Sequence, residues 1–197
     1  MLDTINFIAT TAREGKMAVL NRAGFKVCTL CGFGLRSEEK PPNPHKTPLG
    51  KDCRGTLIYT DLGHEFRSDI LDFKIKGYSN SDKAFWLSLL YALLEGASES
   101  LEVSRDDLDG CLYPYAGDPT KPAIILFDDV PGGAGHVKRL ASPDMLRHLL
   151  ETTRDKVSNC ECGEETSCYG CLRNYRNQFC HDELKRGIVK NFLERIL

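Results

Sequence analysis

Nine cysteines are the residues of this 197-residue chain whose chemistry is easiest to interpret. Four of them follow the pattern Cys160-x-Cys162-x5-Cys168-x2-Cys171, with glycines between them that let the chain turn tightly. Four thiolates surround a tetrahedral zinc ion and leave no position open for water or substrate, so such a site is structural. We therefore predict structural zinc here, with Cys180 as an alternative fourth ligand. The competing reading is a loop of free thiols, which would be prone to oxidation.

A second group of ligand residues lies near the N-terminus. Cys28-x2-Cys31 is one half of a zinc knuckle, and His45 and Cys53 lie at a spacing that would complete a Cys3His site. A lone Cys-x2-Cys pair is also compatible with a redox role. We expect zinc at this group as well. Cys111 lies alone in a predicted strand, where a thiol is most often a small buried hydrophobe.

The charged residues are unevenly distributed. The whole chain has 26 basic and 28 acidic side chains, so no global field draws it to nucleic acid or anionic lipid. Residues 13–54, however, contain nine Lys or Arg and four acids. Zinc in this region would fix the cations on one compact surface, where they could contact DNA phosphates. The candidate DNA-binding residues are Lys26, Arg36, Lys46, Lys51 and Arg54.

Two other patterns could support chemistry. Residues 128–136 form a glycine-rich link from a predicted strand to a helix; they match neither a Walker A loop nor a dinucleotide fingerprint, which favours a tight turn over an anion site. Acids also gather near the ends of predicted strands and on a helix, and converging carboxylates could hold Mg2+ for phosphodiester hydrolysis, although a solvated acidic face is commoner. These acids are Asp69, Asp72, Glu95, Asp106, Asp107, Asp109, Asp128 and Asp129.

The elements that would position these groups follow from hydrophobic spacing. It predicts helices over 83–101, 143–157 and 181–196, with Ser142 as an N-cap. Strands are predicted over 16–20, 25–28, 57–59, 68–75, 106–115 and 122–130, with turns at 21–24 and 117–119 and a loop over 40–50. We therefore expect an α+β fold: a mixed, mostly antiparallel sheet covered by helices, with a C-terminal zinc segment and an N-terminal zinc knuckle. We divide it into residues 1–56, the basic knuckle region, and 57–197.

The composition sets the class of protein. Apolar residues make up 41% and charged residues 27%, which is typical of a soluble globular domain. No apolar run approaches the roughly 18 to 20 residues needed to span a bilayer, so no membrane contact is expected. Residues 1–12 lack the pattern of a signal peptide. We place the chain in the cytoplasm, where thiols stay reduced.

Three stretches together resemble one family. They are 19–32, with Val19-Leu20-Asn21-Arg22, Gly24-Phe25 and the Cys28 knuckle; 127–135; and 160–186, with the four cysteines, Asn177-Gln178, His181, Leu184 and Arg186. The combination is similar to the C-terminal zinc-binding domain of MrfA-type superfamily 2 helicases, which also occurs in the DISARM protein DrmB. In that family the cysteines corresponding to the 160–171 set bind zinc.

The resemblance implies a function. It suggests an accessory domain of, or partner to, a DNA helicase in DNA repair or antiphage defence, with a helicase motor domain or subunit as partner and possible contact with DNA. The chain has neither a G-x-x-x-x-G-K-[ST] motif nor a D-E-x-H box, so we expect no motor activity of its own. The alternatives are a metal-dependent nuclease built on the carboxylates and a pure protein-interaction module.

Overall fold

The computed structural model describes residues 6–114 and 118–197, without the side chains of residues 13 and 21–23. In chain order the strands and helices are β1 (Asn6–Cys28), β2 (Gly34–Arg36), β3 (His45–Lys46), β4 (Asp52–Cys53), β5 (Leu57–Lys76), α1 (Lys83–Leu101), η1 (Arg105–Asp107), β6 (Leu108–Tyr113), β7 (Ala123–Asp128), α2 (His136–Arg139), α3 (Pro143–Ser158), η3 (Gln178–Glu183) and α4 (Arg186–Ile196). Within these ranges no helix is both long enough and apolar enough to cross a membrane.

The strands form one five-stranded sheet in the order β2-β1-β5-β7-β6 and a small β3-β4 pair. β5 and β6 each run antiparallel to β7, and β2 runs antiparallel to β1. The expected α+β class, a mostly antiparallel sheet with helices, is therefore confirmed. The hairpin of β6 and β7 is present as predicted, whereas residue 117 of its expected turn lies outside the described residues.

The chain forms two compact units. The larger unit comprises residues 1–15 and 67–197, and the smaller unit comprises residues 16–66. Each unit takes part of β1 and part of β5, so no single cut along the sequence separates them. The division into 1–56 and 57–197 stays a prediction about domains.

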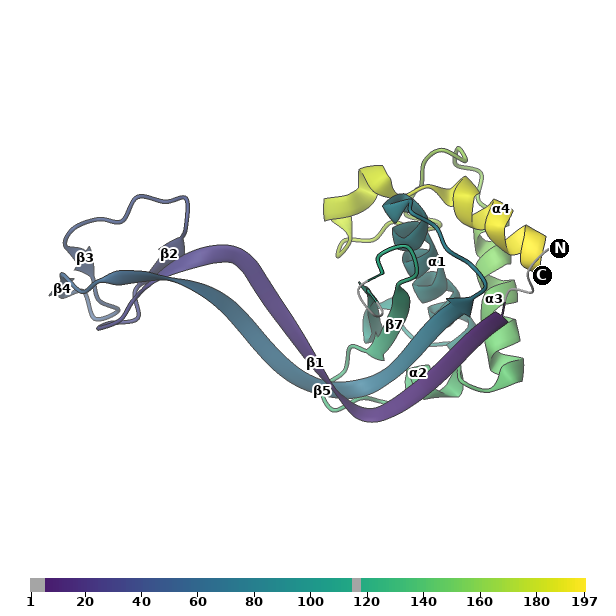
Figure 1. Cartoon of the computed structure of the whole chain (residues 1–197), viewed down its shortest axis with the longest axis horizontal. Coiled ribbons are helices and arrows are strands. Elements are labelled where there is room, and N and C mark those ends of the chain that lie inside the picture. Colours follow the sequence, from purple (N-terminus) through teal and green to yellow (C-terminus); the bar gives the residue numbers. More distant parts are fainter. Residues whose placement is uncertain (1–5, 115–117) are drawn as a thin grey trace. The chain divides into compact units, whose positions relative to one another are not determined.

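Helix α1 is the centre of the larger unit. It packs against α3, α4 and β6, and its side chains are buried on almost every side, from Phe85 to Leu101. A helix that is apolar all round belongs in an interior rather than at a surface. Asp82 caps its first turn by accepting the backbone N–H of Ala84 at 2.9 Å. Figure 1 shows the helices gathered around β7 and the C-terminal end of β5.

Helix α3 begins where the sequence predicts. The Ser142 hydroxyl accepts the backbone N–H of Met145 at 3.3 Å, and proline follows in the first turn. At the other end of the chain, Phe192 of α4 packs edge-to-face on Phe85 of α1, with ring centroids 5.1 Å apart. Helices α3 and α4 flank the segment that contains the four C-terminal cysteines.

Four predicted short strands do lie in strands, but the predicted breaks between them are wrong. Residues 16–20 and 25–28 belong to a single strand, β1, without a turn at 21–24, and residues 57–59 and 68–75 belong to β5. The last predicted helix is shorter than expected, because η3 occupies residues 178–183 and α4 begins at Arg186. The middle of β5 buries few side chains, so its sequence carries little alternation from which to predict a strand.

Candidate metal centres

The four C-terminal cysteines meet in the loop between α3 and η3. Cys160 Sγ lies 3.5 Å from Cys162 Sγ and 3.5 Å from Cys168 Sγ, and Cys171 Sγ lies 3.7 Å from Cys162 Sγ and 3.9 Å from Cys168 Sγ. Ligands 2.3 Å from a tetrahedral zinc ion would be about 3.8 Å from one another. The donor set therefore fits zinc. Cys180 is not part of it, because its buried thiol donates to the carbonyl of Asn177 at 3.3 Å.

The loop backbone donates hydrogen bonds to two of these sulfurs. Cys168 N–H donates to Cys171 Sγ at 3.3 Å, and Gly170 N–H donates to Cys168 Sγ at 3.3 Å. Burial raises the pKa of the Cys171 thiol and that of Cys162. For Cys160, burial acts in the same direction, but the Cys162 backbone and the neighbouring thiols outweigh it and lower the pKa. Protons that burial retains on these thiols would be released when a metal binds.

The N-terminal group brings together Cys28, Cys31, His45 and Cys53, whose ligand atoms all lie within 4.8 Å of one another. Cys28 Sγ lies 3.9 Å from Cys53 Sγ, and Cys31 Sγ lies 3.3 Å from His45 Nε2. Three sulfurs and one imidazole nitrogen are a common tetrahedral zinc set.

Local structure explains how distant residues reach this group. Cys28 ends β1, and β3 pairs with β4 so that His45 lies directly opposite Cys53. The imidazole is only 2% exposed and stacks on Phe33, with centroids 4.8 Å apart. Burial raises the pKa of the Cys28 thiol, but hydrogen bonds from the Leu30 and Cys31 backbone and from neighbouring side chains outweigh this and lower it to about 6. Gly55 leaves room for the site, since a Cβ there would lie 2.5 Å from Cys28 Sγ.

The structure thus brings all eight predicted ligands into two groups of four, and the zinc expected as cofactor is consistent with both donor sets. Each group has four protein ligands, so each would hold a structural ion. That these particular residues bind zinc stays a prediction. Among the residues that the structure describes, these two groups are the sets of three or more His, Cys, Asp or Glu arranged to hold a metal.

Sequence reasoning missed the role of Arg186. Its side chain is 6% exposed, and its guanidinium donates to the carbonyl of Val157 at 2.7 Å and twice to that of Cys162, at 2.7 and 3.1 Å. The backbone N–H groups of Arg186 and Gly187 donate to the carbonyls of Thr166 and Glu164, each at 2.8 Å. The loop over 159–172, which carries the four C-terminal cysteines, is called the zinc loop below. Hydrogen bonds therefore hold the start of α4 against this loop and against the end of α3.

The glycine-rich segment over 128–136 is a turn whose backbone N–H groups are bound by the carboxylate of Asp128. The carboxylate of Asp128, which is 1% exposed, accepts the backbone N–H groups of Ala134 at 2.7 Å, Val137 at 2.9 Å and His136 at 3.0 Å. These donors at the start of α2 are the ones that a bound phosphate would need. The turn interpretation therefore holds, and Asp128 has a structural task.

Most of the candidate catalytic acids have cationic partners. Asp69 binds Lys138 at 2.5 Å, and Glu95 binds Arg105 at 3.0 Å. Asp72 binds Lys74 at 2.6 Å. Asp106, Asp109 and Asp129 surround the guanidinium of Arg176, whose pKa they raise, Asp129 most strongly. Acids that surround an arginine are not arranged to hold Mg2+, so this geometry gives the nuclease reading no support.

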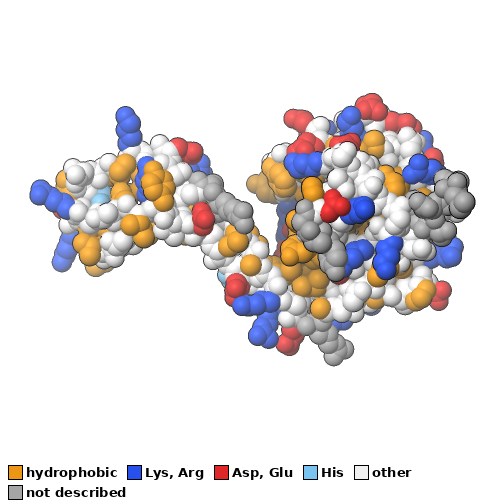
Figure 2. All heavy atoms as spheres, in the orientation of Figure 1, with side chains coloured by type: hydrophobic (Ala, Val, Ile, Leu, Met, Phe, Trp, Pro, Cys, Tyr) orange, Lys and Arg blue, Asp and Glu red, His pale blue; other side chains and the backbone are white. Residues whose placement is uncertain are grey.

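The five candidate DNA-binding cations lie in the smaller unit. Arg36, Lys46, Lys51 and Arg54 are exposed. Lys26 is half-buried; it donates to the carbonyl of Glu39 at 3.1 Å and lies 5.5 Å from the centre of the Tyr59 ring. Lys46 also forms an ion pair with Asp52. Figure 2 shows Lys and Arg side chains protruding from this unit in several directions.

Comparison with known proteins confirms the resemblance. Residues 89–172 match the family model of the MrfA Zn-binding domain, a range that contains the C-terminal cysteines and excludes the N-terminal group. The Druantia protein DruE of Escherichia coli (strain UMEA 4076-1) is 26% identical over 226 residues, covering 98% of this chain and 12% of that protein. The chain thus spans about an eighth of the curated relative's length.

One solved structure supports the fold. A crystal structure of the DUF1998 helicase MrfA bound to DNA matches with a TM-score of 0.54 and 13% identity, over 98% of this chain and 25% of that one. A second MrfA structure, bound to DNA and AMPPNP, matches with a TM-score of 0.46 and 12% identity, over 97% of this chain and 22% of that one.

Proposed function

We propose that this chain is a zinc-stabilised accessory domain of, or partner to, a DNA helicase in DNA repair or antiphage defence, and that the motor activity resides elsewhere. One observation carries the proposal: residues 89–172 match the MrfA Zn-binding domain, and the four thiols in that range lie at zinc-ligand separations. The similarity to DruE is the support for the defence role. We assign the chain to the cytoplasm, where reducing conditions keep thiols available as ligands.

In this proposal zinc has a structural task. A bound ion supplies cross-linking that the loop over 159–172 has too little core to provide for itself. Cys160, Cys162, Cys168 and Cys171 would hold it, and Arg186 transmits the fixed loop geometry to α4 through the carbonyl of Cys162. The second ion, on Cys28, Cys31, His45 and Cys53, would order the smaller unit.

DNA contact is assigned to the smaller unit. Lys46, Lys51 and Arg54 each lie within two residues of His45 or Cys53, so a zinc ion on those ligands would also fix the backbone that carries these cations. Cations that are already ordered bind phosphates at a smaller entropy cost than the same residues on a loose loop. Binding of this kind is weak, independent of base sequence and weakened by salt.

The test is a titration of fluorescently labelled DNA with the full chain at several salt concentrations. Cys31→Ser should weaken binding several-fold although no cation is removed, whereas Cys111→Ser, which alters a thiol outside both groups, should not. Reversing the charge at Lys46 and Lys51 to Glu should weaken binding without removing a zinc ligand. DNA affinity that survives both loss of the metal and charge reversal would contradict this contact, and a chain that binds no DNA would favour the pure protein-interaction reading.

A further inference from the structure

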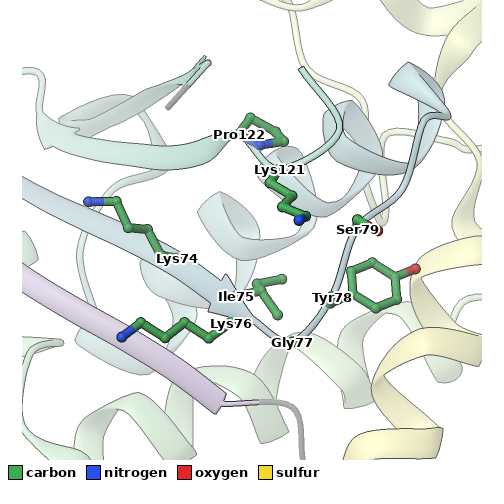
Figure 3. Close-up of a pocket in the computed structure, with 8 residues that line it drawn as sticks. All are labelled: Lys74, Ile75, Lys76, Gly77, Tyr78, Ser79, Lys121 and Pro122. Carbon is green, nitrogen blue, oxygen red and sulfur yellow. The ribbon is translucent and has the colours of Figure 1, made fainter. Parts of the chain in front are cut away.

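A hollow in the larger unit is lined by three lysines. It has a volume of about 510 Å³ and lies where β5 ends, between Lys74 and Lys76 on one strand and Lys121 ahead of β7. Tyr78 and Ser79 also line it. Figure 3 shows that Lys74 and Lys76 extend in a common direction from β5, while the amino group of Lys121 points into the hollow on the side of Ser79.

The three lysines lie just beyond the end of the ladder that β5 forms with β7. β5 pairs with β7 so that Phe73 lies opposite Ile124. This is the last pair of the ladder, so Lys74 and Lys76 continue β5 beyond it, and Lys121 lies two residues ahead of the first residue of β7. An anion in the hollow would therefore meet cations from both segments.

Nearby acids do not neutralise these lysines completely. Lys74 is paired with Asp72 at 2.6 Å, and the charge of Lys121 contributes to lowering the pKa of Asp118, after the hydrogen bonds from Thr120. In the part of the chain that the structure describes, neither Lys76 nor Lys121 has a carboxylate within salt-bridge distance. An ammonium has three donors, so Lys74 can keep Asp72 and still donate to a ligand.

We propose that this hollow binds phosphate groups of a nucleic-acid backbone. Its cations are spread along both sides rather than converging on one point, which suits a chain of phosphates crossing the hollow better than a single ion. Ile75 and Pro122 add apolar lining to the hollow. The hollow lies in the larger unit, whereas the DNA contact proposed above uses basic side chains of the smaller unit. The hollow is therefore a second, separate contact.

The test compares Lys76→Gln and Lys121→Gln with Arg147→Gln, which removes an equal charge from an exposed position on α3. The measured quantity is the slope of log binding constant against log salt for a labelled oligodeoxynucleotide. Each lysine variant should make the slope shallower by about 0.7 for single-stranded or about 0.9 for double-stranded DNA, and Arg147→Gln should not change it. Equal slopes for all three variants would overturn the backbone site, even if Cys31→Ser still weakens binding.

A second experiment distinguishes a phosphate of a nucleic-acid backbone from a free phosphate compound as the ligand of this hollow. If the chain binds no oligonucleotide, the DNA contact of the proposed function fails, and inorganic phosphate is titrated while the lysine side chains are followed by nuclear magnetic resonance. Changes in the chemical shifts of Lys76 and Lys121 that disappear in the variants would assign the hollow to a free phosphate compound and overturn the nucleic-acid assignment. If phosphate changes no chemical shift at these lysines, the site itself is overturned.

Discussion

At the scale of single residues, the ligands and the groups that support them differ in how readily a sequence reveals them. Cysteine pairs with one or two residues between them are recognisable because few other tasks require that spacing. Arg186 has no such signature, since a buried arginine and a surface arginine look alike in sequence. Only its contacts with Val157 and Cys162 show that it joins α4 to the zinc loop.

Replacing Arg186 by Ala should destabilise the larger unit by about 3 kcal/mol, because the carbonyls of Val157 and Cys162 lose charged donors. Arg186→Lys should recover only part of the loss, since one ammonium cannot reproduce the planar guanidinium fork. Chemical denaturation measures both changes, with Arg195→Ala at the exposed end of α4 as the control. A loss for Arg186→Ala no larger than that of the control would contradict this role.

Asp69 should make the larger unit sensitive to acid. Its hydrogen bond with Lys138 outweighs burial and lowers the pKa of the carboxyl. A lowered folded-state pKa means that the stabilisation is fully present above the unfolded value of about 3.9 and is lost as pH falls through the folded pKa. Urea unfolding across this acidic range should show less pH dependence in Asp69→Asn than in the parent chain. Asp61→Asn, at an exposed position, should match the parent, and identical profiles for all three would contradict the assignment.

At the scale of elements, burial decides what can be predicted. α1 and α3 begin at the predicted residues because their apolar spacing and caps are both strong. β1 and β5 are longer than predicted because much of each strand is exposed, so strand pairing rather than burial gives them their regularity. α4 begins later than predicted because its first turn follows from contacts with the zinc loop, which no local pattern encodes.

Gly187 allows α4 to approach that loop. A Cβ at this position would lie 2.6 Å from Glu164 Cβ and 2.9 Å from the Glu164 carbonyl oxygen. Glycine to alanine in a helix ordinarily stabilises by about 1 kcal/mol, but here the clash involves backbone and should outweigh that gain. We expect Gly187→Ala to lower the unfolding midpoint in urea, and Gly34→Ala, which meets nothing within 4 Å, to leave it nearly unchanged. An increase in stability for Gly187→Ala would show that α4 does not need this close approach.

At the scale of the whole molecule, we propose different tasks for the two groups of zinc ligands. Zinc at the C-terminal group would fasten the helices of the larger unit, and zinc at the N-terminal group would order the smaller unit, where the proposed DNA-binding cations lie. The formal net charge of −2 hides this arrangement, since the local excess of basic residues is cancelled elsewhere in the chain. A helicase partner would supply the ATP-hydrolysing motifs that this sequence lacks.

The metal content of the purified chain, measured by mass spectrometry, tests the central claim most directly. Two groups of four ligands predict about two zinc ions per chain. Cys168→Ser should retain about one, because it disables only the C-terminal group, and Cys111→Ser should retain both. A parent chain without zinc, or a Cys168→Ser variant with unchanged stoichiometry, would contradict the account.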